Sequence, residues 1–209
     1  MNDTRPAIFV IDDDAAVRRA IARLLRAAGM EVIVCASAQA YLDQFDPARP
    51  GCLILDLAMP AFNGLQLQVA LTARGNAPPI IFLTGHAQVP DSVQAMKHGA
   101  ADFLTKPVDE EALLESVCSA VGKDRIDRRA RAELADIQRR FATLTARELQ
   151  VLACVVAGKL NKQTAAELGT VEKTVKVHRA HIMEKIQAQS LAELVHLATR
   201  AGITTPPWQ

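Results

Sequence analysis

The stretch AIFVIDDD, residues 7–14, decides the fold prediction because it joins an apolar run to three consecutive carboxylates. Asp12, Asp13 and Asp14 carry like charges that repel one another, and no basic residue adjoins them in the sequence. The run before them, Ile8–Ile11, is short and apolar, as in a strand buried on both faces of a sheet. A buried strand that ends in acids predicts a binding site at the end of that strand.

Strand-like and helix-like segments alternate through residues 5–122. Four further strand-like runs occur at Val32–Cys35, Leu53–Leu55, Ile80–Leu83 and Phe103–Thr105. Between the runs, apolar residues recur at helical spacing: Val17, Ile21, Leu24 and Leu25; Leu65, Val69 and Ala73; Leu113, Leu114, Val117 and Val121. A further helical stretch with Val93, Met96 and Lys97 leads to Gly99. This alternation predicts βαβ units and a parallel sheet, in an α/β fold of the flavodoxin-like, doubly wound type.

Polar side chains follow several of the predicted strands. Asp56 ends the third strand in LILDLAMP, Thr84 ends the fourth in IIFLTGH, and Lys106 follows the fifth in DFLTKP. Ligands of doubly wound sheets bind beyond the carboxyl ends of the strands, so these groups should meet Asp12 and Asp13. Each signal is weak alone, because a strand-end Asp is often a helix cap. Together the carboxylates predict a site for a hard divalent cation, Mg²⁺.

The rest of the chain has the pattern of an all-α region. A charged segment, 123–143, carries an apolar stripe of Ile126, Ala130, Leu134, Ile137 and Phe141. It predicts a helical linker that either pairs with another helix or packs on its own domain. Four short helices follow, near 146–157, 162–168, 171–186 and 191–201, within a domain spanning 144–204. The tail, including Trp208, is expected to be loose.

Capping signals and a Gly turn define a helix-turn-helix pattern in this region. Thr145 with Glu148, and Ser190 with Glu193, are capping boxes, while Asn161 and Thr170 are further N-cap candidates. The segment NKQTAAELGTVEKTVKVHRA, residues 161–180, has a short helix, a Gly turn and a basic second helix. An αα-hairpin with a solvated basic face remains the alternative.

Charge is divided unevenly along the chain, although the net charge is only +1. Residues 1–122 hold nine Lys/Arg and fourteen Asp/Glu, giving −5, whereas 123–209 hold fifteen and nine, giving +6. The two parts therefore favour a cation and a polyanion as partners. The four cysteines lack metal-binding spacing, and no signal peptide or membrane-spanning run is present. We expect a cytoplasmic protein with reduced thiols.

The motifs VIDDD, LDLAMP, LTG and KPVD make residues 5–122 resemble the receiver domain of two-component response regulators. The resemblance implies that Asp56 accepts a phosphoryl group from a sensor histidine kinase. It further implies Mg²⁺ binding by Asp12, Asp13, Asp56 and the Ala58 carbonyl, and pairing of Lys106 with phosphoryl oxygens. Thr84 and Phe103 would form a conformational switch, and the Lys106–Pro107 bond would be cis. Asp14 has no ligand role in the family, so we expect it to cap the next helix.

The motifs LTARELQVL, NKQTAAELG and TVKVHRAHIMEKI resemble the LuxR-type DNA-binding domain. The order of domains resembles the NarL/FixJ class of response regulators, with details closest to its FixJ and StyR members. The resemblance implies double-stranded DNA as partner, a homodimer after phosphorylation, and no enzyme activity of its own; RNA polymerase is a further candidate partner. Groove contacts are expected from Lys176, Val177 and Arg179, and phosphate or positioning roles from Lys162, Thr174 and His178. His181 is expected to pack, and Ala180 departs from the basic residue of some relatives.

Two other functions fit parts of the sequence. The acids Asp12 and Asp14 also suit a haloacid-dehalogenase-like phosphatase, in which Asp12 would be the nucleophile. That alternative leaves the basic helical half without a role. A receiver whose output domain binds protein or RNA is the second alternative.

Overall fold

A computed structural model describes residues 5–59, 63–75, 77–85 and 95–203, in two compact units, Met1–Arg128 and Arg129–Gln209. The predicted positions of Val93 and Trp208 lie outside the described residues, as does the end of the second predicted domain at residue 204. None of the described helices is both long and apolar enough to cross a membrane.

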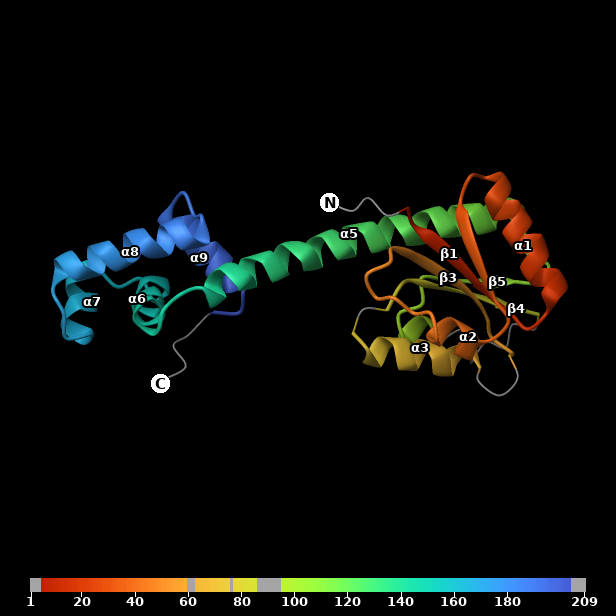
Figure 1. Ribbon diagram of the computed structural model, residues 1–209, viewed down its shortest axis with the longest axis horizontal. Coiled ribbons are helices and arrows are strands. Elements are labelled where there is room, and N and C mark those ends of the chain that lie inside the picture. Colours follow the sequence, from red (N-terminus) through yellow and green to blue (C-terminus); the bar gives the residue numbers. More distant parts are fainter. Residues whose placement is uncertain (1–4, 60–62, 76, 86–94, 204–209) are drawn as a thin grey trace. The chain divides into compact units, whose positions relative to one another are not determined.

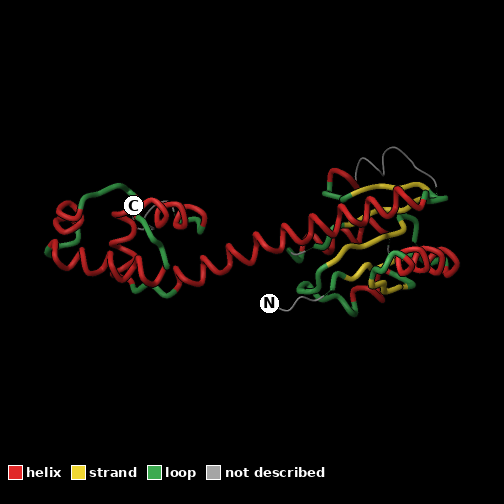
Figure 2. Tube along the Cα trace, turned by 90° about the horizontal axis from the view of Figure 1, so that it is seen from above, coloured by secondary structure: helices red, strands yellow, loops and turns green. Residues whose placement is uncertain are grey.

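The first unit is built on a parallel sheet of five strands in the order β2-β1-β3-β4-β5. The strands are labelled in Figure 1 and drawn in yellow in Figure 2. This order confirms the flavodoxin-like prediction. The three central strands are buried throughout, which explains their continuous apolar runs. The strands are β1 (Ala7–Ile11), β2 (Glu31–Cys35), β3 (Gly51–Asp56), β4 (Ile80–Thr84) and β5 (Asp102–Thr105).

Helices cover both faces of the sheet because alternate strand residues point to opposite sides (Figure 1). On one face, Ile8, Val10 and Ile54 pack with residues of α1 (Ala15–Ala27) and of α5 (Glu110–Ala142). On the other face, strand residues pack with α2 (Ala38–Leu42) and α3 (Gly64–Ala73). Two helical layers thus enclose the sheet and leave its strand ends open.

The buried face of α3 differs from the predicted one. Leu67 and Leu71 are fully buried, whereas Val69 is 52% exposed. Gln68 is also buried on this face, and its side-chain Nε2 donates to the Ala95 carbonyl at 3.1 Å. Met96, predicted to face the core, is likewise 50% exposed, and Ala95 is buried in its place. Both apolar stripes of α3 have helical spacing, so periodicity could not distinguish them.

Helix α5 runs without a break through the predicted receiver boundary at Gly122. Its residues as far as Arg128 belong to the first unit and the rest to the second. The predicted apolar stripe is divided accordingly: Ile137 and Phe141 are buried in the core of the second unit, while Ile126 is 67% exposed. The end of the stripe therefore packs on its own domain, which was one of the two alternatives.

In its described residues, 129–203, the second unit contains helices joined by short turns and no strand. Its helices are α6 (Ala146–Val156), α7 (Asn161–Glu167), α8 (Glu172–Ile186) and α9 (Leu191–Arg200), together with the end of α5. Both predicted capping boxes begin helices, although only the first is complete. The predicted caps Asn161 and Thr170 are wrong, because the N-cap positions of α7 and α8 are Leu160 and Val171, whose apolar side chains cannot accept a hydrogen bond.

Candidate functional site

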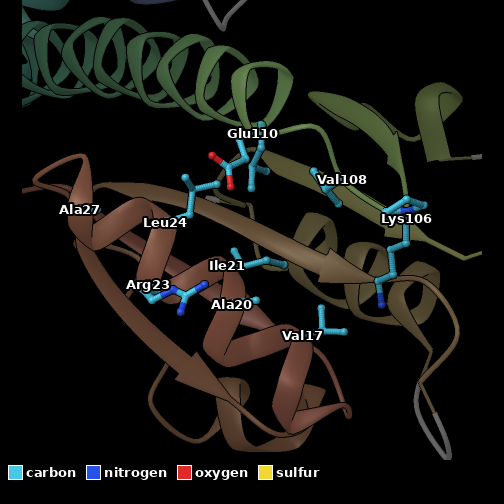
Figure 3. A pocket seen from close by; sticks show the side chains of 11 residues that line it. Val17, Ala20, Ile21, Arg23, Leu24, Ala27, Lys106, Val108 and Glu110 are labelled. Carbon is cyan, nitrogen blue, oxygen red and sulfur yellow. The ribbon is translucent and has the colours of Figure 1, made fainter.

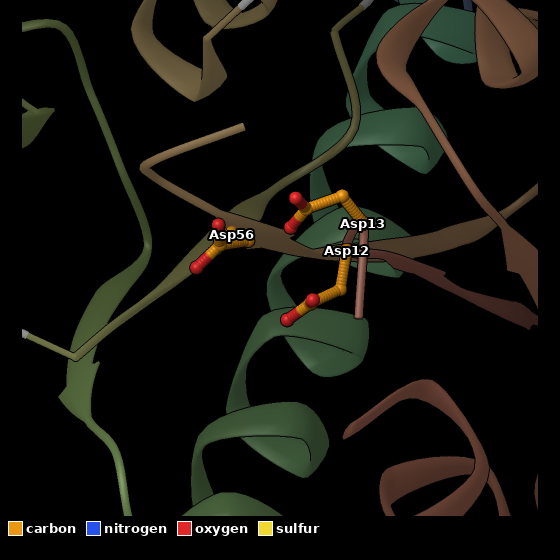
Figure 4. A group of neighbouring side chains, drawn as sticks. All are labelled: Asp12, Asp13 and Asp56. Atoms are coloured by element: carbon orange, nitrogen blue, oxygen red, sulfur yellow. The ribbon is translucent and has the colours of Figure 1, made fainter. Parts of the chain in front are cut away.

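Three carboxylates meet at the carboxyl ends of β1 and β3 (Figure 4). Asp12 follows β1 and Asp56 is the last residue of β3, and these two strands are neighbours in the sheet. One oxygen from each of Asp12, Asp13 and Asp56 lies within 4.8 Å of the others. Asp12 and Asp56 are buried and Asp13 is exposed, so the group opens to solvent on one side.

Lys106 joins the two buried acids. Its Nζ donates to Asp12 Oδ2 at 2.6 Å and to Asp56 Oδ1 at 2.8 Å. Buried carboxylates are costly unless they are paired, and Lys106 supplies the partner. Three carboxylates and one ammonium leave a formal charge of −2, which matches a divalent cation. The convergence predicted for Asp12, Asp13, Asp56 and Lys106 is therefore observed.

Backbone groups orient the same carboxylates. The Ala58 amide donates to Asp56 Oδ2 at 3.1 Å, and the Asp14 amide donates to Asp12 Oδ1 at 2.8 Å. Arg18 donates from Nη1 to the Asp12 carbonyl at 2.5 Å. Each buried acid thus has both carboxylate oxygens engaged, which fixes their directions before any ligand binds. Sequence reasoning missed Arg18, whose only signal was a basic residue one turn into the next helix.

Two pKa values reflect this arrangement. Burial works to lower the pKa of Lys106, but its hydrogen bonds to Asp12 and Asp56 outweigh burial and leave the pKa raised. Lys106 is therefore a fixed positive charge. Asp14 accepts from the amides of Ala16 and Val17 at the start of α1, and these bonds lower its pKa. Asp14 is thus the helix cap that was predicted.

Thr84 and Phe103 lie on the adjacent strands β4 and β5. Thr84 is buried at the end of β4, and its carbonyl accepts from the Lys106 amide at 2.7 Å. Phe103 is half-buried, with its ring centroid 6.4 Å from that of Phe82. The Lys106–Pro107 bond is cis, as expected. Thr84 therefore lies at the same edge as the acids, whereas Phe103, in register with Phe82, lies two residues before the end of β5.

An apolar groove of about 530 Å³ adjoins the acidic site (Figure 3). It lies between α1 and the segment 106–113, and apolar side chains such as Val17, Leu24 and Val108 line it. Lys106 contributes to its wall while its Nζ contacts Asp12 and Asp56. The groove therefore shares Lys106 with the acidic site.

The second unit presents a basic helical face. On α8, Lys173, Lys176 and Val177 are exposed, while Val175 and Ile182 are fully buried. Lys162 on α7 is exposed as well. Lys176 pairs with Glu172 at 3.3 Å on the surface, a contact that competes weakly with other partners. The exposed side of α8 therefore combines cationic and apolar groups, as a nucleic-acid surface requires.

Three other predicted residues lie beside this face. Thr174 and His178 are half-buried, and Arg179 donates from Nη1 to Asn161 Oδ1 at 2.9 Å. His181 is exposed, so the prediction that it packs is wrong; the core of α8 is completed by Ile182 and Ile186 instead. The sequence pattern did not reveal the Asn161 contact, because it joins residues 18 positions apart.

A buried ion pair anchors α5 at the opposite end of the sheet. Asp124 is 2% exposed and accepts from Arg128 Nε at 2.7 Å and from the Gly51 amide at 2.9 Å. Arg128 also donates to the carbonyls of Pro47 and Arg49, both at 2.7 Å. A Cβ at Gly51 would lie 1.9 Å from the Ala7 carbonyl oxygen, so only glycine fits there. Nothing in the local sequence marked Asp124, one of several acids in a charged segment, as buried.

Comparisons with known proteins match both units of the chain. The family model for the response regulator receiver domain matches residues 8–118, and the model for bacterial regulatory proteins of the luxR family matches 142–198. Nodulation protein W of Bradyrhizobium diazoefficiens is 42% identical over 96% of this chain and 88% of its own length. The transcriptional regulatory protein FixJ of Azorhizobium caulinodans is 44% identical over 94% of this chain and 93% of its own.

Solved structures show the same similarity. The response regulator StyR has a TM-score of 0.86 at 44% identity, over 94% of this chain and 100% of that one. Full-length FixJ from B. japonicum has a TM-score of 0.58 at 42% identity, over 96% and 98% of the two chains. Nearly the whole chain is therefore covered by relatives with both regions.

Proposed function

Because this chain belongs to the DNA-binding response regulators of two-component systems, in the NarL/FixJ class, we propose that Asp56 is its phosphoryl acceptor. The supporting observation is the bonding of Asp56 at the strand edge: Lys106 binds one carboxylate oxygen and the Ala58 amide the other. A sensor histidine kinase is the proposed donor. The chain then acts as a substrate and regulator rather than as an enzyme.

The proposed transfer needs positioning and charge neutralisation more than proton chemistry. An Asp56 oxygen attacks the phosphorus of a phosphohistidine, an O–P bond forms, and the P–N bond to the imidazole breaks. Lys106, with its raised pKa, stays protonated and pairs with a phosphoryl oxygen. To do so it exchanges its bond to Asp56 for one to the phosphoryl group, while its bond to Asp12 keeps it in place.

Mg²⁺ fits the donor set at this site, because oxygen ligands and a residual charge of −2 are what a hard divalent cation requires. We assign Asp12, Asp13, Asp56 and the carbonyl of Ala58 as its protein ligands. When bound, the ion supplies neutralisation of charge on the phosphoryl oxygens.

For the second unit, we propose that α8 enters the major groove of duplex DNA. Lys176 and Val177 are exposed on its outer face and are the proposed base-edge contacts, with Arg179 beside them. Lys162, Thr174 and His178 are proposed to contact phosphates or to position the helix. We keep 5–122, 123–143 and 144–204 as the proposed receiver, linker and DNA-binding domains.

The proposed consequence of phosphorylation is dimerisation. Thr84 would move toward the phosphoryl group and Phe103 would rotate inward. The surface formed by about residues 90–122, which include β5 and the start of α5, would then change. Two copies would then place two α8 helices on half-sites about one DNA turn apart, ~34–36 Å. RNA polymerase is a proposed later partner, and the cytoplasm is the proposed location.

Trapping the acyl phosphate tests the acceptor assignment. The protein is incubated with Mg²⁺ and a small phosphodonor, reduced with borohydride and mapped by mass spectrometry. Reduction at Asp56, absent in Asp56→Asn, is the expected result. Reduction at Asp12 would instead support the phosphatase alternative. That alternative is disfavoured by Asp14, whose carboxylate caps α1 rather than facing a leaving group.

Mass measurement by sedimentation tests the dimer. Beryllofluoride, a phosphoryl mimic, should convert the monomer to a dimer in the wild type and less so in Thr84→Ala. A mimic-bound monomer that nevertheless gains DNA affinity would contradict the dimer proposal and indicate release of inter-domain inhibition.

A further inference from the structure

Arg179 lies at the edge of the exposed face of α8, between Lys176 and the buried side of the helix. It lies one helical turn after Val175 and three residues before Ile182, both of which are fully buried. At 3.6 residues per turn, the exposed Lys176 lies about 60° around the helix from Arg179, and the exposed Val177 lies about 160° from it. Arg179 is half-buried at the flank of the helix, next to α7.

Asn161 holds Arg179 in this position. The Asn161 side chain accepts from Arg179 Nη1 at 2.9 Å, and Asn161 is the first residue of α7. A guanidinium has five donors, so this bond leaves the others able to bind an anion. The amide is also neutral: a carboxylate here would cancel the arginine charge, whereas Asn161 orients the side chain and leaves its charge intact.

We propose that Asn161 is a positioning residue that directs Arg179 to one DNA backbone phosphate, so that Arg179 adds affinity without reading a base. In helix-turn-helix proteins the first helix crosses the DNA backbone, while the second reads base edges. A cation tied to the first turn of α7 therefore lies where phosphates pass. Fixing a long side chain before binding reduces the entropy that DNA binding would otherwise cost.

This inference rests on the proposed DNA-binding role of α8 and narrows the part of Arg179 within it. The probes are two duplexes of equal length and composition: one selected from a random pool by the wild-type protein, and a shuffled version of it. Affinity for each is measured by fluorescence anisotropy across a series of salt concentrations. The proteins are wild type, Asn161→Ala, Arg179→Ala and the double variant, all as full-length chains.

The expected result has three parts. Arg179→Ala lowers affinity for both duplexes by the same factor and makes the slope of log K against log salt less steep by about 0.9, the value for one phosphate. Asn161→Ala also weakens both duplexes equally, but it changes the slope less because the charge remains. In the Arg179→Ala background, Asn161→Ala has no further effect.

Two further variants serve as controls. Arg179→Lys keeps the charge and should retain most of the wild-type slope even if Arg179→Ala folds poorly. Gln138→Ala, an exposed residue on the part of α5 in the same unit, should change neither affinity nor slope. Thermal unfolding followed by circular dichroism shows which variants are folded.

Other outcomes would overturn the inference. A loss confined to the selected duplex would make Arg179 a base reader, and losses that add in the double variant would separate Asn161 from Arg179. If the wild-type protein selects no duplex at all, the proposed DNA-binding role itself fails, which is a different result from failure of the positioning role.

Discussion

Asp13 is the proposed Mg²⁺ ligand whose substitution should disturb the fold least. It is exposed, whereas Asp12 and Asp56 are buried and accept hydrogen bonds from Lys106. Asp13→Ala should lower Mg²⁺ affinity by about tenfold, ~1.4 kcal/mol, while the free energy of unfolding without Mg²⁺ changes by less than about 0.5 kcal/mol. Isothermal calorimetry that found unchanged Mg²⁺ affinity would remove Asp13 from the ligand set.

Glu148 gives the second unit a pH-dependent stability. Its bonds to Lys185 Nζ at 2.7 Å and to the Thr145 amide lower its pKa from 4.5 to about 2. A folded-state pKa below the unfolded value contributes stability that is present above pH 4.5 and is lost as the pH falls toward 2. Glu148→Gln should therefore lower the free energy of unfolding by about 1.5 kcal/mol near pH 7 and leave it unchanged near pH 2. The loss is no larger because Lys185 is partly exposed.

Urea unfolding, followed by hydrogen exchange in peptides of α6 and α8, measures that difference at each pH. Arg147→Gln would not serve as a control at neutral pH, because Arg147 donates to the Leu168 carbonyl. Gln138→Glu, at an exposed position on the surface, is a suitable control. A gap between wild type and Glu148→Gln that stays constant from pH 6 to about 2 would contradict the assignment.

At the scale of elements, α5 depends on a buried ion pair for its attachment to the sheet. Asp124→Ala would leave the Arg128 guanidinium and the Gly51 amide without their acceptor. Removing one partner of a buried pair costs about 3–5 kcal/mol, and partial exposure of Arg128 places the expected loss near 3 kcal/mol. Chemical denaturation of the first unit measures the loss, with Lys123→Ala on the exposed side as control.

The start of α8 allows a stabilising change. Val171 is its N-cap, is 65% exposed and provides no side-chain acceptor. Val171→Thr should raise the free energy of unfolding of the second unit by about 1 kcal/mol, whereas Val177→Thr, within the helix, should not. Equal effects of the two substitutions on thermal unfolding would show that α8 gains nothing from a cap.

These elements also show what the sequence could and could not predict. The order of strands and helices was predictable because each central strand is a continuous apolar run between helical stripes. The acidic site followed from that order, since parallel strands end at one edge. The five-residue helix α2 was not found because it is too short to show a helical period. The caps of α7 and α8 were misplaced because apolar residues occupy them.

Contacts between distant residues were beyond the sequence pattern. Asn161 with Arg179, and Asp124 with Gly51, join residues that no local spacing relates. Each is a polar side chain whose partner is determined by packing, whereas the acids of the receiver site share a position in the topology. For the same reason, the division of the α5 stripe between an exposed Ile126 and a buried Ile137 could not be decided beforehand.

In the whole molecule, the acidic half and the basic half carry different sites, and the proposed function makes one control the other. The first unit gathers carboxylates and one lysine at a strand edge, and the second exposes a basic helix. A phosphoryl group at Asp56 can raise DNA occupancy only as far as it favours the binding-competent state, so some binding should persist without it. Two weakly binding copies joined in a dimer gain effective concentration on paired half-sites.

Phosphorylation of Asp56 is proposed to control DNA binding. Measuring the affinity for DNA with and without a phosphodonor tests this proposal. The wild-type protein and Asp56→Asn are each titrated against the duplex selected from a random pool, with Mg²⁺ present throughout. The phosphodonor should tighten binding by the wild type and leave Asp56→Asn at its basal affinity. An equal gain in Asp56→Asn, or no gain in a wild-type protein shown by mass spectrometry to carry the phosphoryl group, would contradict it.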